Sequence, residues 1–219
     1  MSPLSARIRV LIADDHALIR EGLSELLGQY PDIEVVGLAS EGNEAVRLAG
    51  ELQPDVAIFD IMMPGLNGID ATTALAQRAA GVRAVMLSMH SGYQHVKLAL
   101  AAGARGYLLK QSASREIAAA VRAVRAGKRY FCAEVEALLS DEDGPDGAEV
   151  SPLQKLSSRE RQVLQLVAEG RSSAEIGGQL HLSAKTVDTY RSRMMQKLGL
   201  SDIAAVVRFA ILHGITPLQ

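Results

Sequence analysis

The stretch IRVLIADD, residues 8–15, is an apolar run that ends in two adjacent carboxylates. Three more short apolar runs, residues 56–59, 84–87 and 107–109, are each followed by one polar residue. Runs of this length predict buried strands. In a parallel α/β sheet, the carboxyl ends of all strands open onto one crevice, where ligands bind. The sequence therefore predicts that five side chains converge at one sheet edge: Asp14, Asp15, Asp60, Ser88 and Lys110.

Predicted helices alternate with these strands over the first 130 residues. A further strand is expected at 35–39, and helices are expected over 18–27, 42–52, 67–78, 94–102 and 114–126. Ser114 is expected to cap the last helix and Gly127 to end it. Such alternation favours βαβ units, so we expect a flavodoxin-like, doubly wound, five-stranded parallel sheet of order 2-1-3-4-5.

The clustered side chains have a chemistry of their own. Neighbouring carboxylates repel one another, and a divalent cation with oxygen ligands relieves that repulsion. Lys110 adds a mobile positive charge, and Ser88 adds a hydroxyl that can meet an incoming oxyanion. Together these groups can accept a phosphoryl group onto one carboxylate. The alternative of ordinary solvated strand ends is disfavoured, because Asp14 and Asp15 together would be costly there without a cation.

Residues 7–130 resemble the receiver domain of two-component response regulators. The resemblance is carried by four stretches in order, at residues 13–16, 59–65, 87–88 and 106–110. It implies that Asp60 is the phosphoacceptor and that Lys110 binds the phosphoryl oxygens. It also implies that Ser88 and Tyr107 form a switch pair.

The same resemblance implies Mg²⁺ as cofactor. Asp15 and Asp60 would be direct ligands, Asp14 would act more through water, and Met62 would contribute its backbone carbonyl. Met62 and His90 flank the site at positions that tune the lifetime of the phosphoryl group. Gln111 follows Lys110 where many receivers have proline, and we expect a trans Lys110–Gln111 peptide because a cis bond without proline costs about 2.5–4 kcal/mol.

Composition bounds the class of protein. The chain has 219 residues, 48% of them hydrophobic and 22% charged, which is ordinary for a globular protein. A lone cysteine, Cys132, excludes an internal disulfide and favours a reducing compartment, so we expect a cytoplasmic protein. No run approaches 18 apolar residues and no signal peptide is expected, so we expect no membrane association.

The charge is divided unevenly along the chain. Residues 1–150 hold 14 Lys/Arg and 20 Asp/Glu, whereas residues 151–219 hold 9 and 5. An acidic first part and a basic second part suggest two modules, the second facing a polyanion. We expect the first domain at 7–130, a linker at 131–154, and a second domain at 155–219. Within the linker, residues 133–139 suggest a short helix, and the Gly/Pro-broken acidic stretch 141–147 predicts a flexible tether.

The last 65 residues predict an all-α domain of four helices. Ser157 with Glu160 and Ser172 with Glu175 fit capping boxes, which open helices over 159–169 and 172–180. Ser183 is expected to cap a helix that runs to residue 198, and Ser201 a helix over 202–212. The short turn at 181–183 joins two of them into a helix-turn-helix.

The third of these helices has one apolar and one polar face. Val187, Met194 and Leu198, with Tyr190 or Arg191, should face the core. The opposite face suits base edges in the major groove, and its flanking cations suit phosphates. The alternative is a solvated helix face in a packing module. The predicted DNA contacts are Lys185, Thr186, Asp188, Thr189, Arg191, Ser192, Arg193 and Lys197.

Residues 156–164, 175–176, 182–187 and 197–198 resemble the LuxR-type DNA-binding domain. With the receiver, this resemblance implies a transcriptional response regulator of the NarL/FixJ subfamily. Gly177-Gly178 departs from the usual alanine-containing stretch and is expected to weaken its helix by about 1 kcal/mol per glycine. Asp188 places a negative charge on the reading face, where it can accept a hydrogen bond from cytosine.

The expected function is phosphorylation-controlled transcription rather than dedicated enzyme activity. The implied partners are a sensor histidine kinase, promoter double-stranded DNA and a second copy of the chain on DNA, with RNA polymerase as a further candidate. Phosphorylation is expected to promote dimerisation, release of the DNA-binding domain, or both. Two alternatives remain: an aspartyl-phosphate hydrolase, which would need a substrate pocket, and a regulator that works without phosphorylation. Acid-labile phosphate incorporation would separate them.

Overall fold

A computed structural model describes residues 7–89, 92–140 and 152–216. The chain forms two compact units. The predicted flexible stretch at 141–147 and His90 lie outside the described residues. In the described part of the chain, every helix is too short or too polar to cross a bilayer.

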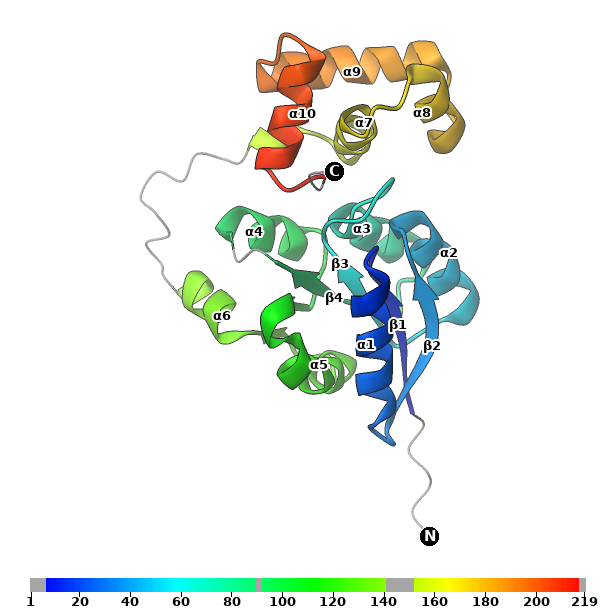
Figure 1. The fold of residues 1–219 in the computed structure, drawn as a ribbon, viewed down its shortest axis with the longest axis vertical. Coiled ribbons are helices and arrows are strands. Elements are labelled where there is room, and N and C mark those ends of the chain that lie inside the picture. Colours follow the sequence, from blue (N-terminus) through cyan, green and yellow to red (C-terminus); the bar gives the residue numbers. More distant parts are fainter. Residues whose placement is uncertain (1–6, 90–91, 141–151, 217–219) are drawn as a thin grey trace. The chain divides into compact units, whose positions relative to one another are not determined.

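A parallel sheet forms the centre of the amino-terminal unit (Figure 1). Its strands are β1 (Ile8–Ala13), β2 (Ile33–Ala39), β3 (Val56–Asp60), β4 (Arg83–Ser88), β5 (Gly106–Leu109) and β6 (Tyr130–Phe131). The order β2-β1-β3-β4-β5-β6 confirms the predicted sequence of the first five strands. The sheet has six strands rather than the expected five, because Tyr130 and Phe131 pair with Gly106 and Tyr107. Two residues are too short a run to show a strand pattern.

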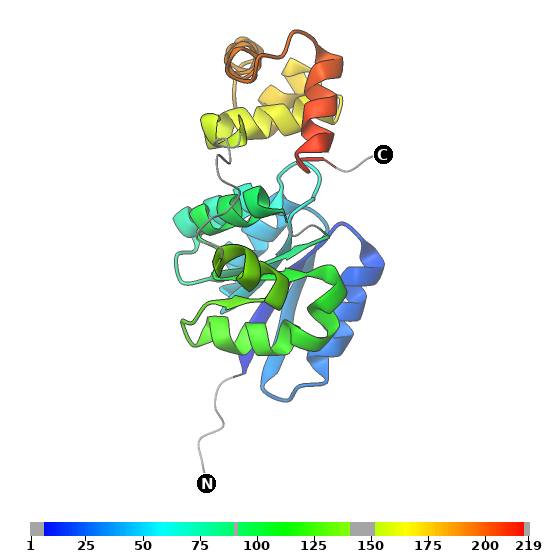
Figure 2. The same ribbon diagram turned by 90° about the vertical axis from the view of Figure 1, so that its left-hand side faces the viewer.

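Helices cover both faces of this sheet (Figures 1 and 2). Helices α1 (Ala17–Gly28) and α5 (Lys110–Arg125) lie against one face. Helices α2 (Gly42–Leu52), α3 (Gly68–Arg78) and α4 (Tyr93–Ala101) lie against the other, and α6 (Ala133–Ser140) follows β6. With both faces covered, the strands bury continuous apolar runs: all five residues of β3 are buried, as are Val10 to Ala13.

Helix α5 begins earlier than predicted. It starts at Lys110, directly after β5, with Leu109 as its N-cap, so Ser114 lies inside the helix and does not cap it. The strand passes into the helix without a loop, and no turn residue marks the boundary. Gly127 follows the helix in the left-handed region (φ 81°), as expected for its end. No cis peptide occurs among the described residues, so the Lys110–Gln111 bond is trans as expected.

The carboxy-terminal unit is helical: η1 (Pro152–Lys155), α7 (Ser158–Ala168), α8 (Ser173–Leu180), α9 (Ala184–Leu198) and α10 (Ile203–Leu212). Both predicted capping boxes are present, and Ser183 caps α9 through the Thr186 amide. The cap of α10 is Asp202 rather than Ser201, because the Asp202 carboxylate accepts the amide hydrogen of Ala205. Val187 and Met194 are buried as predicted, and Leu198 is half-buried.

Gly177 and Gly178 have different surroundings in α8. A Cβ atom on Gly177 would lie 2.6 Å from the Leu182 carbonyl oxygen, whereas a Cβ on Gly178 would meet open space. The Leu182 amide also donates to the Gly177 carbonyl at 2.8 Å, closing the turn between α8 and α9. The expectation that each glycine weakens the helix relative to alanine is therefore wrong at Gly177, where the turn requires glycine.

Candidate functional site

The strand ends of the amino-terminal unit bring four of the predicted side chains together. Asp14 follows β1, Asp60 ends β3, Ser88 ends β4, and Lys110 follows β5. The Lys110 ammonium nitrogen lies 2.8 Å from Asp14 Oδ2 and 3.0 Å from Asp60 Oδ2. All three side chains are buried, Lys110 with 7% of its side chain exposed. The Lys110 ammonium, at the end of β5, thus bridges the carboxylates at the ends of β1 and β3.

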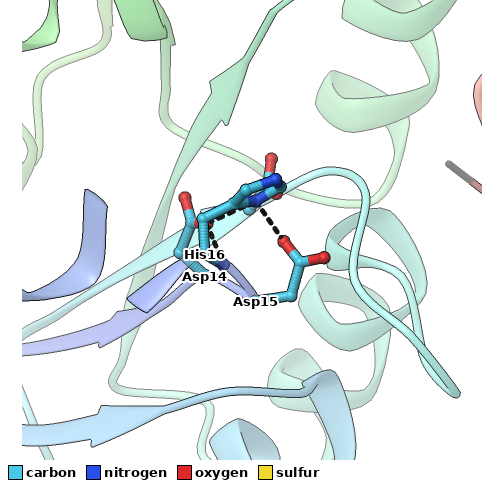
Figure 3. A group of neighbouring side chains, drawn as sticks. Asp14, Asp15 and His16 are labelled. Atoms are coloured by element: carbon cyan, nitrogen blue, oxygen red, sulfur yellow. Dashed lines mark hydrogen bonds and ion pairs between the residues drawn. The ribbon is translucent and has the colours of Figure 1, made fainter. Parts of the chain in front are cut away.

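Asp15 and His16 complete the cluster (Figure 3). His16 Nδ1 lies 2.7 Å from Asp15 Oδ1 and 3.3 Å from Asp14 Oδ1, and the His16 amide donates to Asp14 Oδ1 at 2.9 Å. Arg20 of α1 donates to the Asp14 carbonyl at 2.6 Å. Sequence reasoning gave Arg20 no role, since nothing in its spacing marks a bond to the loop. These contacts hold the loop between β1 and α1 in place.

The donor set fits a divalent cation. Ligand atoms of Asp14, Asp15, His16 and Asp60 all lie within 4.8 Å of one another. Three of them are carboxylate oxygens, which Mg²⁺ and Ca²⁺ prefer. Asp14 is fully buried and paired with Lys110, whereas the Asp15 side chain is 23% exposed and its Oδ1 lies beside His16. Met62 is half-buried two residues beyond Asp60, and the role of its carbonyl stays a prediction.

Burial dominates the electrostatics of the phosphoacceptor candidate. Burial and, to a smaller extent, the Asp14 carboxylate raise the pKa of Asp60, Lys110 opposes them, and the resulting pKa is about 7. Burial lowers the pKa of Lys110, but the Asp60 and Asp14 carboxylates outweigh it, so the net shift is upward and the ammonium stays charged. Without a cation, Asp60 therefore takes up a proton near neutral pH.

The predicted switch pair is in direct contact. Ser88 and Tyr107 lie on neighbouring strands, and both are buried. Burial raises the pKa of Tyr107, a hydrogen bond with Ser88 opposes the rise, and the resulting pKa is about 12. The phenol is therefore protonated at any physiological pH and able to donate. A change at Ser88 would reach Tyr107 through this bond.

Gly68 is a site residue that sequence reasoning missed. A Cβ atom there would collide with the Asp60 carbonyl oxygen. The Gly68 amide donates to the Ile61 carbonyl at 3.0 Å, and the Ile61 amide donates to the Leu87 carbonyl at 3.0 Å. The loop after Asp60 thus folds back tightly over the strand end. The available signal was the Asn67-Gly68 dipeptide, a turn signal in the loop that follows the apolar strand ending at Asp60.

On α9, most of the predicted DNA contacts are exposed, while Thr186 and Arg191 are half-buried. Several of them already have partners inside the unit. Ser173 donates to Asp188 at 2.6 Å, Thr189 donates to the Lys185 carbonyl at 3.0 Å, and Lys197 pairs with Glu160 at 2.7 Å. The exposed contacts are Lys185, Asp188, Thr189, Ser192, Arg193 and Lys197.

Both units match known families. Residues 10–122 match the response regulator receiver domain, and residues 154–210 match the bacterial regulatory proteins of the luxR family. The chain is a NarL/FixJ-type two-component response regulator. It is 37% identical to response regulator UvrY of Escherichia coli over 95% of both chains. It is 40% identical to LiaR of Bacillus subtilis, covering 89% of this chain and 92% of that one.

Solved structures give the same result for this response regulator. RcsB of Salmonella typhimurium matches 94% of this chain and 98% of its own, with a TM-score of 0.60 and 27% identity. RcsB in a complex with DNA matches 96% of this chain and 100% of its own, with a TM-score of 0.58 and 27% identity. The regulator therefore consists of a receiver followed by a LuxR-type DNA-binding domain, and it matches these relatives over nearly their whole length.

Proposed function

We propose that Asp60 accepts a phosphoryl group from a partner histidine kinase, and that this event controls transcription from promoter DNA. The observation that carries the proposal is the Lys110 ammonium, which lies 3.0 Å from Asp60 and 2.8 Å from Asp14 at the strand ends. Mg²⁺ would be held by Asp15 and Asp60 directly, by Asp14 through water, and by the Met62 carbonyl. When bound, it supplies positive charge that offsets the charge of the transferring group.

The transfer itself is a simple displacement. A carboxylate oxygen of Asp60 forms a bond to phosphorus as the bond from phosphorus to the donor nitrogen of the kinase histidine breaks. The product is an acyl phosphate that carries more negative charge than the carboxylate it replaces. Lys110 exchanges its contact with Asp60 for the phosphoryl oxygens, a charge-assisted interaction that is stronger than a neutral hydrogen bond.

Ser88 and Tyr107 would pass the change outward. The Ser88 hydroxyl donates to a phosphoryl oxygen and alters its hydrogen bond with Tyr107. This alters β5 and the adjoining surface, which favours dimerisation, release of the DNA-binding domain, or both. Two helix-turn-helix units then bind half-sites about one helical turn apart. RNA polymerase is a candidate contact of the DNA-bound dimer, and the regulator would act in the cytoplasm without being a dedicated enzyme.

The test is phosphate incorporation from acetyl phosphate with Mg²⁺, followed by DNA binding of the same sample. We expect acid-labile incorporation in the wild type, none in Asp60→Asn, and tighter DNA binding only where phosphate is incorporated. Normal stoichiometry in Asp60→Asn would refute the acceptor assignment. Equal DNA binding with and without phosphate would instead favour a regulator that works without phosphorylation.

A further inference from the structure

Lys197, in the last turn of α9, reaches a buried carboxylate of α7. Its ammonium nitrogen lies 2.7 Å from Glu160 Oε2. The Glu160 side chain is 4% exposed, whereas that of Lys197 is 43% exposed. The pair therefore joins the carboxyl end of the reading helix to the first turn of another helix in the same unit.

Glu160 is held by the capping box as well. The same oxygen, Oε2, accepts the Ser157 amide hydrogen at 2.7 Å and the Ser157 hydroxyl at 2.9 Å. A buried carboxylate is costly unless donors surround it. Burial raises the pKa of Glu160, but the bonds from Lys197 and Ser157 outweigh it, and the net shift is downward. Glu160 is thus a buried carboxylate whose charged form is stabilised by the Lys197 ammonium.

This arrangement conflicts with a role for Lys197 as a phosphate contact, the role that the sequence predicts. A cation strengthens DNA binding by displacing counterions from phosphates. The charge of Lys197 is already balanced by Glu160. Arg193 is exposed one turn earlier on α9, and within the described residues it has no ion pair. Arg193 therefore has a free charge for phosphate, and Lys197 does not.

We propose that Lys197 is a positioning residue, which fixes the carboxyl end of the reading helix on α7 and makes no phosphate contact of its own. The fully buried side chains of α9 are Val187, in its first turn, and Met194, four residues before its end. Leu198, at the end, is only half-buried. Beyond Met194, the ion pair therefore adds a restraint on the last turn of the helix to the partial packing of Leu198. This inference rests on the proposed binding of DNA by this unit.

The experiment uses the full chain and a short mixed-sequence DNA duplex, with binding measured over a salt series. The variants are Lys197→Met, which keeps the alkyl stem, Glu160→Gln, which keeps the acceptor for Ser157, and Arg193→Met as the matched control. We expect Arg193→Met to lower the salt slope by about one. Lys197→Met and Glu160→Gln should keep the wild-type slope and weaken binding about two- to fivefold at every salt concentration.

The Glu160 variant separates the two roles most sharply. If Lys197 bound phosphate, freeing its ammonium in Glu160→Gln would tighten binding and steepen the slope. That result overturns the proposal, and so does a loss of one slope unit, or unchanged binding, in Lys197→Met. Glu160→Gln decides the matter alone if Lys197→Met fails to fold. A wild type that shows no DNA binding even at the lowest salt concentration, with or without phosphate, would instead refute the proposed DNA-binding function.

Discussion

Alanine at Gly177 and alanine at Gly178 should have opposite effects on the carboxy-terminal unit. Gly178 is exposed and a Cβ there meets open space, so Gly178→Ala gains helix propensity of about 0.8–1 kcal/mol. The same gain is available at Gly177, but the new Cβ would lie 2.6 Å from the Leu182 carbonyl oxygen. Relieving that overlap costs about 1–3 kcal/mol by analogy with overpacked cores.

The overlap also disturbs the hydrogen bond from the Leu182 amide to the Gly177 carbonyl, which contributes about 1 kcal/mol. The net effect of Gly177→Ala is therefore a destabilisation of about 1–3 kcal/mol, and the two variants should differ by about 2–4 kcal/mol.

Native-state hydrogen exchange of the α9 amides in the full chain measures this difference, because it reports the unit that contains the turn. Each 1.4 kcal/mol corresponds to about tenfold in protection. Gly178→Ala should raise protection and Gly177→Ala should lower it. Equal protection in the two variants would refute the argument that the turn needs glycine at Gly177 rather than merely tolerating it.

Four further outcomes follow from the site and the reading helix. The pKa of Asp60 is raised to about 7, so its contribution to the free energy of unfolding is fully present below pH about 4 and is lost as pH rises through about 7. Asp60→Asn should remove this pH dependence, which amounts to up to about 4 kcal/mol, in urea titrations without magnesium. Asp15→Asn should weaken Mg²⁺ binding more than Asp14→Asn in calorimetric titration, because Asp15 is the more open ligand; equal, small effects would count against the site. Lys110→Ala should keep some phosphate incorporation but lose the increase in DNA affinity in the same sample, because no ammonium remains to bind the phosphoryl oxygens. A full increase in DNA affinity would contradict this. Thr189→Ala should cost about 1–3 kcal/mol of discrimination between matched and mismatched sites at constant salt slope, and an intact preference would show that the helix is rotated.

The strand ends were predictable because each is a buried apolar run followed by one polar residue. That pattern alone places Asp60 and Lys110 at the same edge, 3.0 Å apart in the structure. Capping boxes at Ser157 and Ser172 were equally readable, since each cap and its partner lie three residues apart. Local signals of this kind need no knowledge of the rest of the fold.

Most of the features that the sequence did not reveal depend on how one element packs against another. The need for glycine at Gly177 arises from a carbonyl five residues later, and that at Gly68 from a carbonyl in the preceding strand. The pairing of Lys197 with Glu160 joins residues 37 apart, and helical periodicity gives no indication of such a partner. The start of α5 was misplaced because no turn residue separates it from β5.

The short strand β6 has a practical consequence for dividing the protein. Tyr130 and Phe131 pair with Gly106 and Tyr107, and the Cys132 amide donates to the Tyr107 carbonyl at 3.1 Å. A fragment that stops at the end of α5 would leave β5 as an open sheet edge, and unpaired edges are templates for association between chains. Dimers of so short a fragment would then result from the exposed edge of β5 rather than from phosphorylation. Receiver fragments intended for oligomerisation measurements should therefore extend through α6.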